Sequence, residues 1–293
     1  MLSSMTVTVL DGKKLSAEIK TELKEEVQRF QQTYQRAPGL VVVRVEGDAA
    51  SGVYTKAILR IAKELGVEAS LEALPAETTT EELRDALLRL NRDPAVHGVI
   101  VQMPLPEHLP QRLVAETLAA EKDIDGISLQ SAGNLALGFP SLYPSTAAAV
   151  VEILERTQTP IEGKRVVILG RSNVVGKPLA LMLLQRNATV TICHSRTQNL
   201  SEVTRESDIL IAAVGRPTMV KAEMVRPGAT VIDVGTNARP EGGIVGDVDY
   251  ASVSEVAGAL TPVPGGVGPL TNVMLMKQCI EAAWRQERER ARA

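Results

Sequence analysis

Aromatic residues, cysteines and histidines are all scarce in this sequence of 293 residues. Because aromatic side chains make up only 2% of the chain, the core must be built from Leu, Val, Ile and Ala. The two cysteines, Cys193 and Cys279, lie far apart and belong to no Cys-x-x-Cys pair, which favours a reducing, cytoplasmic location. The three histidines share no metal-ligand spacing with each other or with the cysteines, so we expect no metal site.

Two further features are missing, and each excludes a class of partner. No uninterrupted apolar run approaches the roughly 20 residues of a membrane helix, so no membrane partner is expected. The formal net charge is −3, without the broad positive field of a nucleic-acid-binding protein, so no nucleic acid is expected. With 44% hydrophobic residues, the chain is typical of a globular protein and is long enough for two domains of about 100–200 residues each.

Strand signals and helix signals alternate along the chain. Short β-branched runs predict buried strands, and apolar residues at four-residue spacing predict helices. Strands are predicted over residues 40–45, 67–74, 96–101, 165–169, 188–192, 209–214, 230–234 and 256–260. This alternation predicts an α/β fold with parallel sheets, and the second half has the strand count of a doubly wound, Rossmann-type domain.

Helices are predicted between these strands, over residues 15–30 and 54–65, after a capping box at Thr79 and Glu82, and from Pro144 onward. A last helix begins near Thr271 and could pack on either domain. Its charged end, residues 285–293, has the composition of a solvated, fraying helix terminus.

A glycine-rich segment, Gly170-Arg-Ser-Asn-Val-Val-Gly176, follows the strand predicted over 165–169 and opens a helix. Such a turn presents amide groups and a helix N-terminus to a pyrophosphate. The spacing differs from G-x-G-x-x-G, so a glycine-rich turn without a ligand stays an alternative. Two more strands end in glycine, at Gly215 and Gly235, and ligands of parallel sheets bind beyond the carboxyl ends of the strands.

The choice of nicotinamide cofactor depends on the end of the next strand, His194-Ser-Arg-Thr197. An NAD site places a carboxylate there for the ribose 2′-hydroxyl, and none is present. Arg171, Ser195 and Arg196 could instead bind a 2′-phosphate, which favours NADP. The predicted cofactor-binding residues are Gly170, Arg171, Ser172, Val175, Gly176, His194, Ser195, Arg196, Thr197, Gly215, Gly235 and Thr236.

Seven segments match one known family in order and spacing. They are Leu10-Asp-Gly-Lys13, Val99-Ile-Val-Gln-Met-Pro-Leu-Pro106, Asp123-Ile-Asp-Gly126, Gly170-Arg-Ser-Asn-Val-Val-Gly176, Thr189-Val-Thr-Ile-Cys-His-Ser195, Val231-Ile-Asp-Val-Gly235 and Thr261-Pro-Val-Pro-Gly-Gly-Val-Gly-Pro269. Over nearly its whole length the chain resembles the bifunctional methylenetetrahydrofolate dehydrogenase/methenyltetrahydrofolate cyclohydrolase family. The resemblance implies two α/β domains flanking a cleft, a folate domain over residues 1–143 plus 268–293, and an NADP domain over 144–267.

The same resemblance implies tetrahydrofolate one-carbon derivatives as ligands and a homodimer formed through the cofactor domain. It assigns Tyr54 to stacking on folate, Gln102 to a place beside the reacting carbon, and Asp125 to the pterin's amino-pyrimidine edge. Pro264, Gly265 and Gly266 would face the folate near the nicotinamide. Taken singly, Tyr54 could be a packing residue, Gln102 a loop residue, and Asp125 a turn-forming acid like its neighbour Asp123.

The folate half departs from the family pattern at three places. The family's active-site helix reads Y-x-x-x-K, whereas this chain has Ile58 at the lysine position, and Lys56 lies about 200° around the helix from Tyr54. The chain also has Ile127-Ser-Leu129 where the family has F-H-P, and Pro144-Ser-Thr-Ala-Ala-Ala149 where it has P-C-T-P-x-G.

These departures predict a dehydrogenase whose cyclohydrolase activity is weak or absent, because hydrolysis needs an acid–base group and hydride transfer does not. A fully bifunctional enzyme with a substitute group is one alternative. A folate- and NADP-binding pseudoenzyme and a dehydrogenase for small hydroxy or keto acids are the others.

Overall fold

The computed structural model describes residues 7–46 and 49–292. The chain forms two compact units, each built from separate segments of the sequence. The six-stranded unit comprises Met1–Ala17 and Thr146–Thr271, and the three-stranded unit comprises Glu18–Ser145 and Asn272–Ala293.

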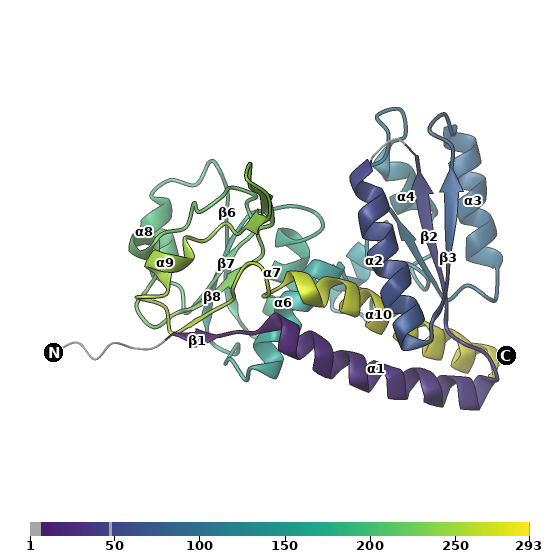
Figure 1. Cartoon of the computed structure of the whole chain (residues 1–293), viewed down its shortest axis with the longest axis horizontal. Coiled ribbons are helices and arrows are strands. Elements are labelled where there is room, and N and C mark those ends of the chain that lie inside the picture. Colours follow the sequence, from purple (N-terminus) through teal and green to yellow (C-terminus); the bar gives the residue numbers. More distant parts are fainter. Residues whose placement is uncertain (1–6, 47–48, 293) are drawn as a thin grey trace. The chain divides into compact units, whose positions relative to one another are not determined.

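The six-stranded unit contains a fully parallel sheet with the strand order β1-β11-β8-β7-β5-β6. Its strands are β1 (Thr8–Val9), β5 (Arg165–Leu169), β6 (Thr189–Cys193), β7 (Ile209–Ala212), β8 (Thr230–Asp233) and β11 (Ala259–Leu260). From β5 the chain passes to β6 on one side and then returns to β7 and β8 on the other (Figure 1). The carboxyl end of β5 is therefore the topological switch point, where doubly wound sheets bind ligands.

The connections of this unit are short helices and one hairpin. They are α6 (Ser145–Arg156), α7 (Gly176–Leu184), α8 (Leu200–Arg205), a 3-10 turn (Ala222–Met224), α9 (Tyr250–Val253), and the antiparallel strands β9 (Asn237–Ala238) and β10 (Ile244–Val245). Aliphatic side chains from β5, β7, β8 and β11 form one buried cluster, in agreement with the expected core composition.

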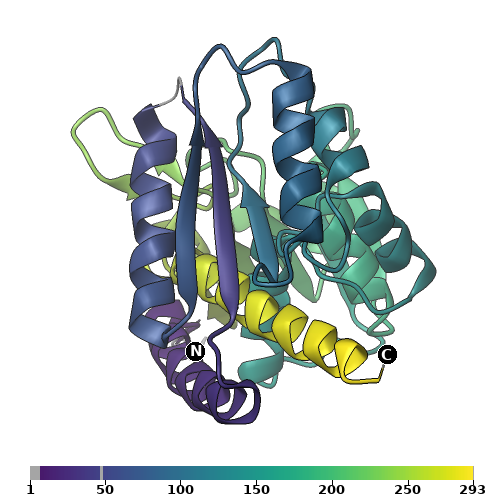
Figure 2. The ribbon, with the colours of Figure 1, turned by 90° about the vertical axis from the view of Figure 1, so that its right-hand side faces the viewer.

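The three-stranded unit contains the parallel sheet β3-β2-β4, made of β2 (Gly39–Val45), β3 (Glu68–Leu74) and β4 (Gly98–Val101). Its helices are α2 (Ala49–Leu65), α3 (Thr80–Arg92), α4 (Gln111–Thr117) and α5 (Leu129–Leu137), with most of α1 (Gly12–Tyr34) and α10 (Gly268–Arg290). Strands β2 and β3 lie between α2 and α3 in both views (Figures 1 and 2).

Strand β2 is buried on both faces, as its apolar sequence, interrupted only by Arg44, predicts. Val41, Val43 and Val45 point to one face and pack with the leucines of α3 and α4. Leu40 and Val42 point to the other face and are also fully buried. This packing on both faces holds β2 in place. It thereby also holds the loop that follows its carboxyl end.

Most predicted elements are present, with limits that differ by a few residues. The capping box is confirmed, because the Thr79 hydroxyl accepts from the Glu82 N–H and the Glu82 carboxylate accepts from the Thr79 N–H. The sequence reading missed α4, α5, β1 and the β9–β10 hairpin, all of which are short. Short elements carry too few residues to show a period.

The unit boundaries differ from the expected division at residues 1–143. Strand β1 pairs with β11, so Met1–Ala17 belongs to the six-stranded unit rather than with the folate half. Residues Asn272–Ala293 join the three-stranded unit, which is therefore discontinuous in sequence, and its return begins four residues later than expected at 268. Pairing between strands 250 residues apart leaves no local trace in the sequence.

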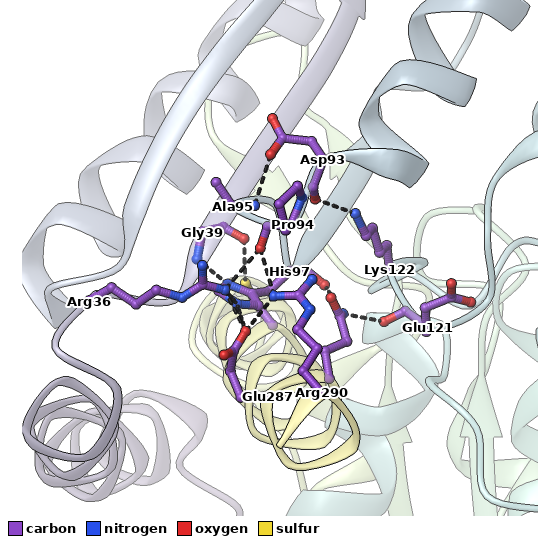
Figure 3. A network of polar contacts seen from close by, with 12 residues as sticks. Arg36, Gly39, Asp93, Pro94, Ala95, His97, Glu121, Lys122, Glu287 and Arg290 are labelled. Atoms are coloured by element: carbon purple, nitrogen blue, oxygen red, sulfur yellow. Dashed lines mark hydrogen bonds and ion pairs between the residues drawn. The ribbon is translucent and has the colours of Figure 1, made fainter. Parts of the chain in front are cut away.

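The prediction of a solvated, fraying helix end over residues 285–293 is only partly correct, because residues 288–292 are exposed but the turn before them is anchored. Helix α10 continues to Arg290, and the carboxylate of Glu287 contacts both Arg36 and Arg290 (Figure 3). The neighbouring Gln286 is buried, and its amide donates to the carbonyl oxygens of His97 at 2.7 Å and Glu121 at 2.9 Å.

His97 lies at the centre of this network and is completely buried. Its Nδ1 accepts a hydrogen bond from the Gly39 N–H at 2.8 Å, and its Nε2 contacts both Arg36 Nη2 at 2.6 Å and the Glu287 carboxylate at 3.2 Å (Figure 3). Burial lowers the pKa of His97 to about 4, even though Glu287 opposes the shift. A neutral histidine thus joins the start of β2, the segment before β4 and the end of α10.

Among the described residues, no helix combines the length and the apolar character needed to cross a membrane. In the same part of the chain, no three His, Cys, Asp or Glu side chains come together as metal ligands would.

Candidate active site

The loop between β5 and α7 requires both of its glycines. Gly170 has φ +119°, and a Cβ there would lie 2.2 Å from the Ala213 carbonyl oxygen. A Cβ at Gly176 would lie 2.2 Å from the Gly170 carbonyl oxygen. The hydroxyl of Ser172 accepts from the Val175 N–H at 3.1 Å and so fixes the start of α7. The sequence therefore forms this tight strand-to-helix turn for steric reasons.

A cavity of about 470 Å³ lies over the carboxyl ends of β5, β6 and β7, at the switch point of the sheet. It is lined by Leu169, Gly170, Arg171, Ser172, Cys193, His194, Ser195, Thr197, Leu200, Ala213, Val214, Arg216 and Met219. Six of the predicted cofactor residues are in this lining. Val175, Gly176, Arg196, Gly215, Gly235 and Thr236 are not.

The lining suits an anionic ligand. Arg171 and Arg216 contribute two positive charges. In the described part of the chain, the backbone N–H groups of Arg171, Ser172 and Asn173 have no protein acceptor. Unpaired N–H groups before a helix are the usual donors to a pyrophosphate. The residues present therefore fit a dinucleotide.

Arg216 and Met219 are cavity residues that the sequence reading missed. The available signal was the strand end at β7, where Gly215 was the single predicted cofactor residue. The structure shows that the Gly215 N–H is already bonded to the carboxylate of Asp247 at 2.9 Å, and the Gly235 N–H to that of Asp233 at 2.9 Å. The backbone N–H groups of these two glycines thus donate to carboxylates of the protein itself.

In the three-stranded unit, Tyr54 and Asp125 come within electrostatic range of each other. Burial raises the pKa of Tyr54, and the negative charge of Asp125 raises it further, so the phenol is neutral. Asp125 accepts from the Ser145 N–H at 3.1 Å and from its hydroxyl at 2.9 Å through one oxygen. Burial raises the pKa of Asp125 to about 6, against the lowering effect of Ser145.

Gln102 follows β4 and is 4% exposed. Its backbone N–H donates to the Val43 carbonyl at 2.9 Å, which fixes the loop against β2. Its side-chain Nε2 is buried without a hydrogen-bond partner among the described residues. A buried, unpaired donor costs about 1–3 kcal/mol, a penalty that a ligand acceptor would remove.

Ile58 lies one helical turn after Tyr54 on α2 and is completely buried. Lys56 is exposed, in keeping with its different direction on the helix. The position one turn from Tyr54 therefore contributes only an aliphatic side chain.

Asp123 has a structural role, in keeping with its description as a turn-forming acid. It is fully buried and accepts from the backbone N–H groups of Ile127 at 3.1 Å and Ser128 at 2.7 Å. The Ser128 hydroxyl in turn caps α5 through the Ser131 N–H at 3.1 Å. The Ile127-Ser-Leu129 segment thus forms a helix start held by Asp123.

Gly265 and Gly266 lie in the six-stranded unit, after β11. Gly265 has φ +117°, and a Cβ at Gly266 would lie 2.6 Å from the Pro262 carbonyl oxygen. The Gly265 carbonyl accepts from the Lys13 N–H at 3.2 Å, while Pro264 is exposed. Both glycines thus meet backbone requirements, and the folate contact assigned to Pro264, Gly265 and Gly266 stays a prediction.

Two family models match the chain. Residues 10–125 match the tetrahydrofolate dehydrogenase/cyclohydrolase catalytic domain, and residues 144–287 match the NAD(P)-binding domain of the same family. The bifunctional protein FolD of Moorella thermoacetica is 48% identical over 96% of this chain and 100% of its own length.

The chain belongs to the tetrahydrofolate dehydrogenase/cyclohydrolase family.

Solved structures of the tetrahydrofolate dehydrogenase/cyclohydrolase family have the same fold. The bifunctional enzyme FolD of Campylobacter jejuni is 41% identical, with a TM-score of 0.93 over 95% of this chain and 99% of that one. The methylenetetrahydrofolate dehydrogenase-cyclohydrolase of Trypanosoma brucei, solved with NADP and an inhibitor, is 36% identical, with a TM-score of 0.91 over 96% and 99%. The expected α/β fold, the Rossmann-type nucleotide domain and the family itself are confirmed.

The residues that line the cavity of the six-stranded unit all lie within the match to the NAD(P)-binding domain. Tyr54, Gln102 and Asp125 all lie within the catalytic-domain match. The two family models thus cover both halves of the chain.

Proposed function

We propose that the chain oxidises 5,10-methylenetetrahydrofolate to 5,10-methenyltetrahydrofolate with NADP, in one-carbon metabolism, and that its cyclohydrolase step is weak or absent. NADP is supported over NAD by Arg171 and Ser195 in the cavity lining and by the lack of a carboxylate at the end of β6. Folate binding is supported by the unpaired amide of Gln102 and by the carboxylate of Asp125.

The dehydrogenase step needs orientation more than acid–base chemistry. The C–H bond of the methylene bridge breaks with its electron pair, NADP is reduced to NADPH, and an adjacent folate nitrogen stabilises the resulting cation. No proton passes to the protein. Asp125 would hold the amino-pyrimidine edge through its oxygen that Ser145 leaves unbonded, and Gln102 would donate to an acceptor near the reacting carbon.

The hydrolytic step has different requirements, because water must lose a proton when it adds to the methenyl carbon and a carbon–nitrogen bond must then break. Positioned acid–base groups contribute about 10²–10⁴-fold to such steps. The observation that carries the proposal is the fully buried Ile58, one turn from Tyr54, at the position of the family's lysine. An isoleucine provides neither a proton nor a charge.

Two alternatives differ from this proposal in the activities that they predict. A fully bifunctional enzyme would need a substitute group, for which Asp125, with its pKa raised to about 6, is better placed than the exposed Lys56. A folate- and NADP-binding pseudoenzyme would bind both ligands without turnover.

The deciding experiment is a paired assay on one purified sample. NADP-dependent oxidation of methylenetetrahydrofolate is followed first, and hydrolysis of methenyltetrahydrofolate is then compared with the buffer rate. We expect NADP reduction with hydrolysis near background. Rapid hydrolysis would establish the bifunctional alternative, whereas NADP binding without reduction would establish the pseudoenzyme.

We also propose a cytoplasmic homodimer formed through the six-stranded unit. Strand β6 is an edge of its sheet, and its residues Thr189 and Thr191 are exposed, so the strand can pair with a second copy. Both cysteines are free and buried, which fits a reducing compartment. Light scattering should give the mass of a dimer, and Val190→Pro, at a position whose N–H points away from β5, should give a monomer. A wild-type monomer would disprove the assembly.

A further inference from the structure

Two buried carboxylates stand at the carboxyl edge of the six-stranded sheet, directly behind the cofactor cavity. Asp233 ends β8 and is 3% exposed, and Asp247 follows β10 and is 0% exposed. In the described part of the chain neither forms an ion pair with Lys or Arg. A buried carboxylate without a cationic partner needs several hydrogen-bond donors, and here most of these are backbone N–H groups.

Asp247 gathers three consecutive backbone N–H groups of the loop after β7. Its Oδ2 accepts from Val214 at 2.6 Å and Gly215 at 2.9 Å, and its Oδ1 accepts from Arg216 at 2.8 Å. The side-chain amide of Asn237 donates the fourth hydrogen bond to this carboxylate, to Oδ1 at 2.9 Å. Val214 and Arg216 line the cofactor cavity, so this carboxylate fixes one wall of it from behind.

Asp233 holds the segment that carries Asp247. Its Oδ1 accepts from the backbone N–H groups of Gly235 and Asp247, both at 2.9 Å, and its Oδ2 accepts from Val248 at 2.9 Å. Its own N–H donates to the Thr261 hydroxyl at 2.7 Å. Burial, and to a smaller extent the charge of Asp247, raise the pKa of Asp233 to about 6, so above that pH both of its oxygens are acceptors.

The carboxylate of Asp233 occupies the space left by the missing side chain of Gly246. The carboxylate of Asp247 likewise occupies the space left by Gly235. A Cβ at Gly246 would lie 1.8 Å from Oδ2 of Asp233, and a Cβ at Gly235 would lie 2.4 Å from Oδ1 of Asp247. The segments Asp233-Val-Gly235 and Gly246-Asp-Val248 are therefore sterically complementary. No alanine fits either position without displacing a carboxylate.

The geometry points to Asp233 and Asp247 as positioning residues for cofactor binding: Asp247 holds the Val214–Arg216 wall of the cavity, and Asp233 holds Asp247. The Gly215 N–H is already bonded to Asp247, so this loop contributes its shape and the Arg216 side chain rather than its amides. The inference rests on NADP being the ligand of this cavity, as proposed above.

The test measures the dissociation constant of NADP directly, by calorimetry, on the full-length protein. In Asp247→Asn the side-chain NH2 group faces backbone N–H groups, so the wall is displaced and we expect binding to weaken about tenfold or more. The KM for NADP should rise more than kcat falls. Asp233→Asn should have a smaller effect, and the double variant should bind about as poorly as Asp247→Asn alone, since both act on one loop.

Asp208→Asn is the matched control. Asp208 also accepts a hydrogen bond from a backbone N–H, that of Arg165 at 2.9 Å, but it lies at the amino edge of the same sheet. The NADP affinity of the Asp208→Asn variant should therefore stay unchanged. If Asp247→Asn does not fold, Asn237→Ala decides, because it removes one bond from Asp247 and should weaken NADP binding about threefold.

The possible results separate the two proposals. A wild-type protein that does not bind NADP would overturn the proposed function. A wild type that binds NADP, with a folded Asp247→Asn or Asn237→Ala variant that binds it equally well, would overturn the positioning role alone.

Discussion

Ile58 and Tyr54 are one turn apart on helix α2, and they differ completely in exposure: Ile58 is 0% exposed, whereas Tyr54 is 36% exposed. The phenol therefore remains accessible to a ligand, while the next position along the same face is closed by an aliphatic side chain. One face of α2 therefore places an exposed aromatic side chain next to a buried aliphatic one.

The first prediction concerns Ile58→Lys. An amine one turn from Tyr54 should raise the rate of methenyltetrahydrofolate hydrolysis about 10²-fold or more, as positioned acid–base groups contribute about 10²–10⁴-fold. It should also lower stability, because a fully buried site disfavours the charged amine. Ile58→Met is the control for size without charge and should leave hydrolysis at background. A folded lysine variant with no gain in hydrolysis would contradict the proposal.

The second prediction concerns the unpaired amide of Gln102. Gln102→Met removes a buried donor that has no partner, so the melting temperature should stay the same or rise. The KM for methylenetetrahydrofolate should rise about tenfold, because the substrate loses that donor.

Gln278→Met is the comparison for this test. The Gln278 amide donates to the carbonyl oxygens of Ile124 at 2.9 Å and Tyr143 at 2.8 Å and also accepts from the Tyr143 N–H, so the variant should lose about 2 kcal/mol or more of unfolding free energy. Equal destabilisation by the two substitutions would show that the Gln102 amide is bonded in solution.

The third prediction is a pH dependence caused by Asp125. Its pKa is raised by burial from 3.8 to about 6 in the folded state, so its contribution to stability is complete below pH 3.8 and is lost as the pH rises through about 6. Wild type should therefore lose stability relative to Asp125→Asn over that interval. The asparagine Oδ1 can still accept from Ser145.

Activity should change in the opposite direction over the same interval. On the proposal that the ionised carboxylate binds the amino-pyrimidine edge, kcat/KM for methylenetetrahydrofolate should rise with pH through about 6 in wild type and stay flat in Asp125→Asn. Thermal unfolding and initial rates between pH 4 and pH 8 check both statements. Parallel profiles for the two proteins would rule out Asp125 as the titrating group.

The fourth prediction concerns the network at the end of α10. Glu287→Gln removes the only carboxylate shared by Arg36, His97 and Arg290 among the described residues and should cost about 3 kcal/mol in urea unfolding. The exposed pair Arg112–Glu116 offers the control, and Glu116→Gln should cost at most about 0.5 kcal/mol. A fraying helix end would give the same small effect for both substitutions.

Local features of the sequence predicted much of the fold correctly. Strand β5 has the predicted limits, and the strand predicted over 230–234 is shorter by only one residue. The Thr79–Glu82 capping box and the turn at Gly170 also needed only neighbouring residues. Hydrophobic period, capping and glycine spacing all act within a few residues, so the sequence carries them directly.

The sequence placed the cofactor loops on the sheet but could not assign their hydrogen bonds. Gly215 and Gly235 were taken as cofactor residues because they end strands, yet their N–H groups are bonded to Asp247 and Asp233. A glycine at a strand end has the same local signature whether its amide faces a ligand or a buried carboxylate 32 residues away.

The sequence by itself determined the α/β class, the glycine turn between β5 and α7, the family and the isoleucine at position 58. Only the tertiary structure decided that β1 joins β11, that α10 is anchored through Glu287, and that the amide of Gln102 is unpaired. The division has one physical cause. Backbone preference and steric limits act between neighbours in the chain, whereas burial and hydrogen-bond pairing depend on residues that only the completed fold brings together.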